Sequence, residues 1–88
     1  MNPANKKKLR AEAHALKPVV MIGQSGLTAP VLAEIEQALN AHELIKVKVR
    51  AERDDRKLIS EKICSDTGAE LIQSIGQIAV IYRLNPNK

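Results

Sequence analysis

The chain has 88 residues, of which 44% are hydrophobic and 27% charged, and its net charge is +4. This length predicts one domain over residues 1–88, and this composition is that of a folded domain rather than a disordered one. One cysteine excludes an intramolecular disulfide and fits a reducing compartment. No apolar run approaches the roughly 20 residues that span a bilayer, and no signal-peptide pattern is visible. We therefore expect a cytoplasmic protein with no membrane partner.

The positive charge is concentrated in the N-terminal segment. Residues 1–17 contain five lysines and arginines against one glutamate, whereas residues 18–88 contain nine basic and nine acidic groups. Such a cluster is typical of a protein that binds a polyanion. On composition alone, a solubilising tail explains it equally well.

Two elements are expected before residue 23. Residues 3–15 predict a helix, because Pro3 suits a first turn and the alanines and Leu9 form a thin apolar stripe. Pro18 ends this helix. The apolar run 19–22 then predicts a short strand buried on one or both faces.

The next two elements have clearer signals. Thr28 is a good N-cap for a helix that extends to about Ala41, with an apolar face formed by Val31, Leu32, Ile35 and Leu39. Residues 44–50 alternate strictly between apolar and basic side chains, which predicts a strand with one buried and one solvated face.

A third helix is expected to begin at Asp54 or Asp55, to bury Leu58, Ile59 and Ile63, and to end before Gly68. Residues 71–75 and 78–82 predict two strands. Gly76 and Gln77 lie between these strands and predict a type II′ hairpin turn.

The predicted order is α-β-α-β-α-β-β, which defines an α+β fold arranged as a two-layer α/β sandwich around a four-stranded mixed sheet. Right-handed crossovers place the second and third helices on one face of this sheet. The opposite face is left for water, the first helix or a ligand.

The most informative motif is a G-x-x-G turn between the first strand and the second helix. Glycine permits positive φ and a close approach of the backbone to a ligand. The N–H groups and dipole of a helix N-terminus favour an anion. A phosphate is the natural occupant, as in the KH-like GxxG loop that clamps a nucleotide backbone. A tight turn with a Thr cap is the structural alternative. The candidate residues are Gly23, Gln24, Ser25, Gly26, Leu27 and Thr28.

A first set of cations alternates along the strand 44–50. Lys46, Lys48 and Arg50 share one sheet face at spacings of roughly 7 Å, comparable with those between phosphates. The alternatives are a solvated face or cross-strand pairing with Glu52 or Glu70.

A second set of cations lies on the first expected helix. Lys6, Arg10, His14 and Lys17 recur every three or four residues and so follow one side of it, and Lys7 and Lys8 widen the set. If this side faces the same way as the glycine turn, the two form one basic groove.

Tyr82 is the only aromatic residue and is expected in or near the core. A platform of stacked bases therefore cannot form, and RNA recognition should depend on phosphate, sugar and shape.

No catalytic constellation is recognisable. The carboxylates of Glu52, Asp54 and Asp55 lie among arginines and lysines and indicate a salt-bridged turn. Cys64 is expected in the core, and no histidine lies at ligand spacing from it. We expect no enzyme activity, no metal, no cofactor and no small-molecule substrate.

Several stretches in order along almost the whole chain resemble the CRM domain family (chloroplast RNA splicing and ribosome maturation), in its stand-alone bacterial YhbY-type form. They are residues 16–20, 22–28, 42–49, 67–69 and 73–76, followed by Tyr82 and Arg83.

The resemblance implies a fold similar to the C-terminal domain of translation initiation factor 3, with a mixed sheet of order 1-2-4-3. It implies association with ribosomal RNA in precursors of the large ribosomal subunit, and RNA contact through Gly23–Gly26 and nearby cations. Many members carry Lys at the second loop position, where this chain has Gln24. We expect a monomer. An adaptor that binds an acidic or ribosomal protein through its basic surface is the alternative function.

Overall fold

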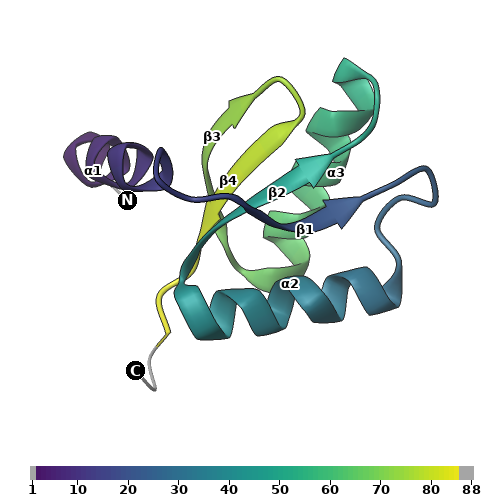
Figure 1. Cartoon of the computed structure of the whole chain (residues 1–88), viewed down its shortest axis with the longest axis horizontal. Coiled ribbons are helices and arrows are strands. Elements are labelled where there is room, and N and C mark those ends of the chain that lie inside the picture. Colours follow the sequence, from purple (N-terminus) through teal and green to yellow (C-terminus); the bar gives the residue numbers. More distant parts are fainter. Residues whose placement is uncertain (1, 86–88) are drawn as a thin grey trace.

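The computed structural model describes residues 2–85, so the expected domain limits at residues 1 and 88 lie outside the described residues. Seven elements follow one another in the predicted order (Figure 1). They are α1 (Pro3–Ala13), β1 (Pro18–Ile22), α2 (Ala29–His42), β2 (Leu44–Val49), α3 (Arg53–Thr67), β3 (Glu70–Ile75) and β4 (Ile78–Tyr82).

The four strands form one mixed sheet in the order β1-β2-β4-β3, as expected. β1 runs parallel to β2, and β4 is antiparallel to both β2 and β3. The crossovers through α2 and α3 place both helices on the same face, where they bury the main core. Its buried side chains come from the sheet and from both helices: Val20 and Ile22, Ile35 and Leu39, Ile45, Val47 and Val49, Ile63, Ala69, Ala79 and Ile81.

The opposite face of the sheet is only partly open, because α1 packs against one end of it. Ala13 of α1 forms a second buried cluster with Leu44, Ile72 and Val80, and Leu9 and Tyr82 pack around it. The expected alternation in β2 therefore holds for Ile45, Val47 and Val49, but Leu44 on the other face is buried rather than solvated. Tyr82 lies near the core, as expected.

Local chemistry explains how the helices begin. The Asn2 side chain accepts a hydrogen bond from the Asn5 N–H at 2.8 Å, and Thr28 caps α2 as predicted. The prediction for α3 was wrong, since Glu52 occupies the N-cap and makes no side-chain cap bond. Asp54 and Asp55 lie in the first turn instead, where carboxylates favour the positive end of the helix dipole.

Two turns depend on glycine. Gly68 has φ +75° and ends α3 in a left-handed C-cap. Gly76 has φ +54° while Gln77 keeps a negative φ, which matches the predicted type II′ pattern of the β3–β4 hairpin.

Leu58 departs from the expected core of α3. Its side chain is 63% exposed, whereas Ile63 is fully buried. A periodic pattern identifies the apolar face of a helix, but it does not determine how many residues of that face are covered by the sheet.

Candidate nucleic-acid interface

The glycine loop is a tight turn at the end of β1. The Gly23 carbonyl accepts a hydrogen bond from the Gly26 N–H at 3.0 Å, and Gly26 has φ +74°. Gln24 and Ser25 are exposed at its tip. Leu27 packs against the main core, and the Thr28 hydroxyl accepts from the Val31 N–H at 3.4 Å. The last two side chains therefore hold the loop in place.

The first turn of α2 offers few free N–H donors for an anion. Pro30 has no N–H, and the N–H of Val31 is used by the Thr28 cap. Within residues 2–85, the backbone N–H groups of Gln24 and Ser25 donate to no protein acceptor. The tip of the turn therefore supplies N–H donors beside those of the helix N-terminus, where the sequence predicts a phosphate.

The loop and the end of β2 lie side by side, which brings two of the predicted features together. The Arg50 N–H donates to the Ile22 carbonyl at 2.9 Å and holds the two strand ends together. The surface here is hollowed, and we call this feature the loop hollow. Its lining consists of Gly23, Gln24, Lys48, Arg50, Ala51, Glu52 and Gln77.

Three of these lining residues were not predicted from the sequence: Ala51, Glu52 and Gln77. Gln77 arrives from the β3–β4 hairpin, and its backbone carbonyl accepts from the Val49 N–H at 2.7 Å. Glu52 adds one carboxylate beside two cations. Neither Gln77 nor Glu52 carries a sequence signal for the site, because their positions depend on how the hairpin pairs with β2.

The lysines of β2 do not pair with carboxylates across the sheet. Lys46 lies opposite Val80, and Lys48 lies opposite Ile78 on one side and Met21 on the other. Both lysines are half-buried. Their aliphatic stems therefore rest on apolar neighbours while the ammonium groups remain available to a ligand. Arg50 lies just beyond the strand and is exposed.

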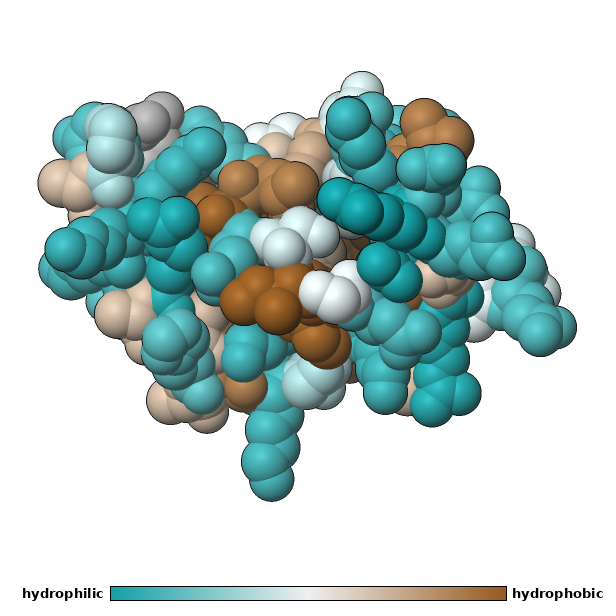
Figure 2. All heavy atoms as spheres, turned by 90° about the horizontal axis from the view of Figure 1, so that it is seen from above, coloured by the Kyte–Doolittle hydropathy of each residue, from teal (hydrophilic) through white to brown (hydrophobic). Residues whose placement is uncertain are grey.

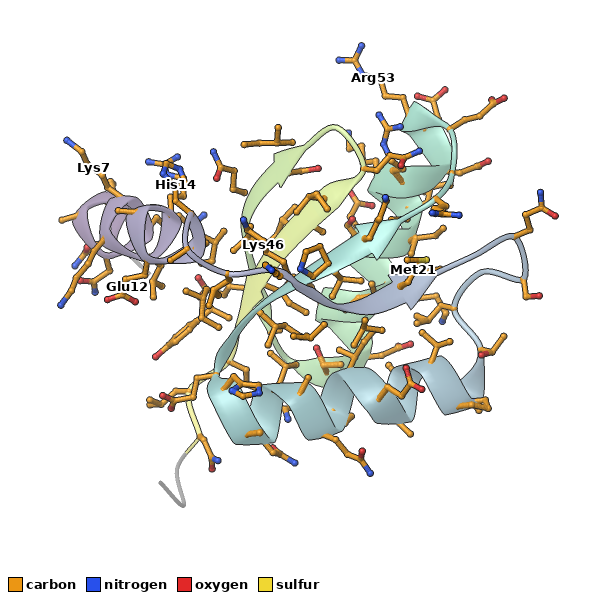
Figure 3. The ribbon with its side chains drawn as sticks, in the orientation of Figure 1. Lys7, Glu12, His14, Met21, Lys46 and Arg53 are labelled. Carbon is orange, nitrogen blue, oxygen red and sulfur yellow. The ribbon has the colours of Figure 1, made fainter. Side chains whose placement is uncertain are left out.

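The cations of α1 form a separate surface. α1 lies at the opposite end of the sheet from the glycine loop, so the two do not form the single groove that was considered (Figure 1). Lys7, Lys8, Arg10 and Lys17 are exposed and Lys6 is half-buried. Lys7 and His14 project from the same side of the helix axis, whereas Glu12 points to the other (Figure 3).

Lys17 does not belong to α1. The helix ends at Ala13, with His14 as its C-cap, and Lys17 lies in the segment that leads to β1. The four-residue spacing therefore describes Lys6 and Arg10, but it does not extend to Lys17.

Among the described residues, the carboxylate turn before α3 is not salt-bridged, and ion pairs instead join Lys62 to Asp66 and Arg83 to Glu36. Cys64 is half-buried against the core, as expected. The pKa of the Cys64 thiol is raised, mainly by burial and secondly by the charge of Glu70. This shift disfavours the reactive thiolate.

Within residues 2–85, no three side chains of the kinds that bind metal ions lie close together. Nor does any helix in that range have both the length and the apolar character to cross a membrane.

Together the α+β fold and the loop hollow define a small binding domain whose surface suits an anionic polymer. The chain belongs to the CRS1/YhbY (CRM) domain family, whose model matches residues 1–83.

Relatives and a solved structure agree with this assignment. The chain is 51% identical over 82 residues to a protein of Pseudomonas aeruginosa named as a probable RNA-binding protein, covering 92% of this chain and 79% of that one. It is 52% identical over 84 residues to an RNA-binding protein of Haemophilus influenzae, covering 94% and 85%. The solution structure of a hypothetical Staphylococcus aureus protein, described as a candidate RNA binder, matches with a TM-score of 0.85 and 36% identity, covering 96% and 88%.

Proposed function

We propose that this protein binds RNA by its phosphate backbone and has no enzymatic activity. The observation that carries the proposal is the loop hollow, where the glycine turn at Gln24 and the two cations Lys48 and Arg50 line one surface. The names of the two bacterial relatives support it.

In this mechanism a phosphate lies at the tip of the glycine turn. The N–H groups of Gln24 and Ser25 donate to its oxygens, as backbone nests do for other anions. Lys48 and Arg50 supply the charge that Gln24 does not. Because Glu52 lies in the same lining, the local excess of positive charge is small. The attraction therefore needs the α1 cations as a second contact.

We further propose that the RNA is ribosomal and that the protein acts in the cytoplasm, as a monomer, on precursors of the large ribosomal subunit. Support comes from membership of the CRS1/YhbY (CRM) domain family, because the resemblance to this family implies a role in ribosome maturation. A cell extract sedimented through a gradient, with and without RNase, tests this part. If the protein leaves large-subunit precursors only after RNase treatment, its association is mediated by RNA. If it stays on the precursors with and without RNase, the protein adaptor is favoured.

Binding to a structured fragment of large-subunit ribosomal RNA across a salt series tests backbone contact. We expect affinity to fall steeply with salt, with a log–log slope of about 0.7–0.9 for each phosphate contact. Replacing Lys48 and Arg50 together with Gln should lower the slope by roughly 1.5. The matched control replaces Lys57 and Lys62 of α3, which removes the same charge from the opposite layer and should change the slope little.

Absence of binding at low salt would overturn the RNA proposal. The basic surface would then be a protein interface, and the adaptor function would take its place. An equal fall in slope for the α3 control would instead mean that only net charge matters, and the loop hollow would lose its role.

A further inference from the structure

A row of side chains crosses the open face of the sheet beside the loop hollow. Met21 of β1 pairs with Lys48 of β2, Lys48 pairs with Ile78 of β4, and Ile78 pairs with Ile75 of β3. Paired residues on neighbouring strands point to the same face, so these four side chains form one continuous line across all four strands. We call it the open-face row. At about 4.8 Å between strands it spans roughly 14 Å.

The ends of this row are apolar and uncovered. Met21 is 52% and Ile75 is 60% exposed, whereas Val20 and Ile22 of β1 lie in the main core and Ile72 of β3 lies in the cluster with Ala13 of α1. The surface between the row and α1 is hollowed and lined by residues that include His14, Lys46 and Gln73. Seen from above, hydrophobic side chains gather in the middle of the molecule, with hydrophilic surface toward α1 on the left and toward the glycine loop on the right (Figure 2).

The charge of Lys48 and the position of the row between two basic surfaces indicate what kind of ligand the row binds. Lys48 belongs to the row and also lines the loop hollow, so the two surfaces are continuous. Lys46 and the cations of α1 lie on the other side. An acidic polymer with flat apolar groups along it matches this alternation, because its charges meet the lysines while its flat groups cover Met21 and Ile75. Unpaired RNA has this chemistry, whereas duplex RNA hides its bases.

We propose that the open-face row binds unpaired nucleotides of RNA, with their bases lying on Met21, Ile78 and Ile75. This inference rests on the proposed function and extends it from phosphate contact to base contact. Aliphatic and thioether groups replace the aromatic rings that this chain lacks, so the contact has little sequence preference. It also explains how two separated basic surfaces bind one RNA, since the strand crosses the open face between them.

The test uses a double variant, Met21→Ser with Ile75→Ser, and three probes. The probes are a short fluorescent single-stranded RNA, the same RNA annealed to its complement, and the same strand with abasic sites in its middle. We expect the double variant to bind the single strand about tenfold more weakly. A loss of affinity of this size is expected because two half-exposed apolar side chains are no longer covered by bases. Its affinity for the duplex and its salt slope should not change. The matched control is Leu58→Ser, which alters a similarly exposed residue on α3.

The abasic probe gives a second measurement that needs no variant. The wild-type protein should bind it about as weakly as the double variant binds the normal strand, and the double variant should lose nothing further. Thermal unfolding followed by circular dichroism checks that the variants fold.

Different outcomes separate the two proposals. If the wild-type protein binds none of the probes at low salt, the proposed function fails. If it binds them and the double variant binds the single strand equally well, only the open-face row fails. An equal loss on single strand and duplex also overturns base contact. Base contact is also overturned if the wild-type protein sediments as a dimer and the double variant sediments as a monomer. In that case a second copy of the chain would cover the row.

Discussion

Arg83 and Glu36 form an ion pair that joins the end of β4 to the middle of α2, with Nη1 of Arg83 donating to Oε2 of Glu36 at 2.9 Å. The same nitrogen donates to the Thr67 carbonyl in the last turn of α3 at 2.8 Å, and Nη2 donates to Oδ1 of Asn40. One guanidinium therefore connects a strand with both helices of the packed layer, and it satisfies an end carbonyl of α3.

Replacing Arg83 with Met should lower the free energy of unfolding by about 1–2 kcal/mol, because three acceptors lose a charged donor while Glu36 remains partly solvated. Arg83→Lys should recover only part of this loss, since an ammonium group cannot reproduce the planar fork. Urea unfolding measures the effect. The control, Arg53→Met at the exposed start of α3, should change stability by less than about 0.5 kcal/mol. Equal stability of the wild type and Arg83→Met would show that the network only orders the side chains.

The sequence predicted the order of elements and their approximate limits because each signal was local. Thr28 marked the start of α2, Gly68 marked the end of α3, and the strict alternation after Leu44 marked β2. The N-cap of α3 was wrong because Asp54 and Asp55 stabilise a first turn nearly as well as a cap. The exposure of Leu58 was missed because packing against the sheet is a tertiary property.

The candidate site was predictable only in part. Local motifs found the glycine turn and the alternating cations of β2, and the parallel pairing of β1 with β2 brings them together. The placement of α1 could not be read from its spacing, since nothing local determines which end of the sheet it covers. Its separation from the loop depends on Ala13 and Leu9 packing near Leu44 and Tyr82. The open-face row required the register of all four strands.

Replacing Lys6, Lys7, Lys8 and Arg10 together with Ala should weaken RNA binding and lower its salt slope, with little change in stability. Because α1 and the loop lie at opposite ends of the sheet (Figure 1), its effect should add to that of the Lys48 and Arg50 double variant within about 0.5 kcal/mol. Titrations of each variant and of their combination measure this. Unchanged affinity would remove α1 from the interface. If the losses in binding free energy were strongly non-additive, the two surfaces would contact the same phosphates.

Gly26→Asp and Gly26→Asn separate backbone strain from charge at the glycine turn. Both place a side chain at φ +74°, where an added Cβ meets no atom within 4 Å, and Asn and Asp tolerate this conformation better than most residues. We expect both variants to fold with a stability loss of about 1 kcal/mol. The Asp variant should bind RNA several-fold more weakly than the Asn variant at low salt, and this gap should shrink at high salt. Equal affinities at all salt concentrations would place the phosphate elsewhere.

Cys64 gives a prediction for alkaline pH. Burial raises the pKa of its thiol in the folded protein above the ordinary value of 9.0, and the charge of Glu70 acts in the same direction. As pH rises past about 9, the unfolded chain therefore loses the thiol proton before the folded protein does. The unfolded state then binds fewer protons, so the free energy of unfolding falls with rising pH. The Cys64→Ala variant lacks this contribution while keeping the other titrating groups. The difference in stability between wild type and variant should be constant below pH 9 and should decrease above it. Urea unfolding at a series of pH values measures the difference, and a gap that stays constant through this range would mean that the folded protein exposes the thiol.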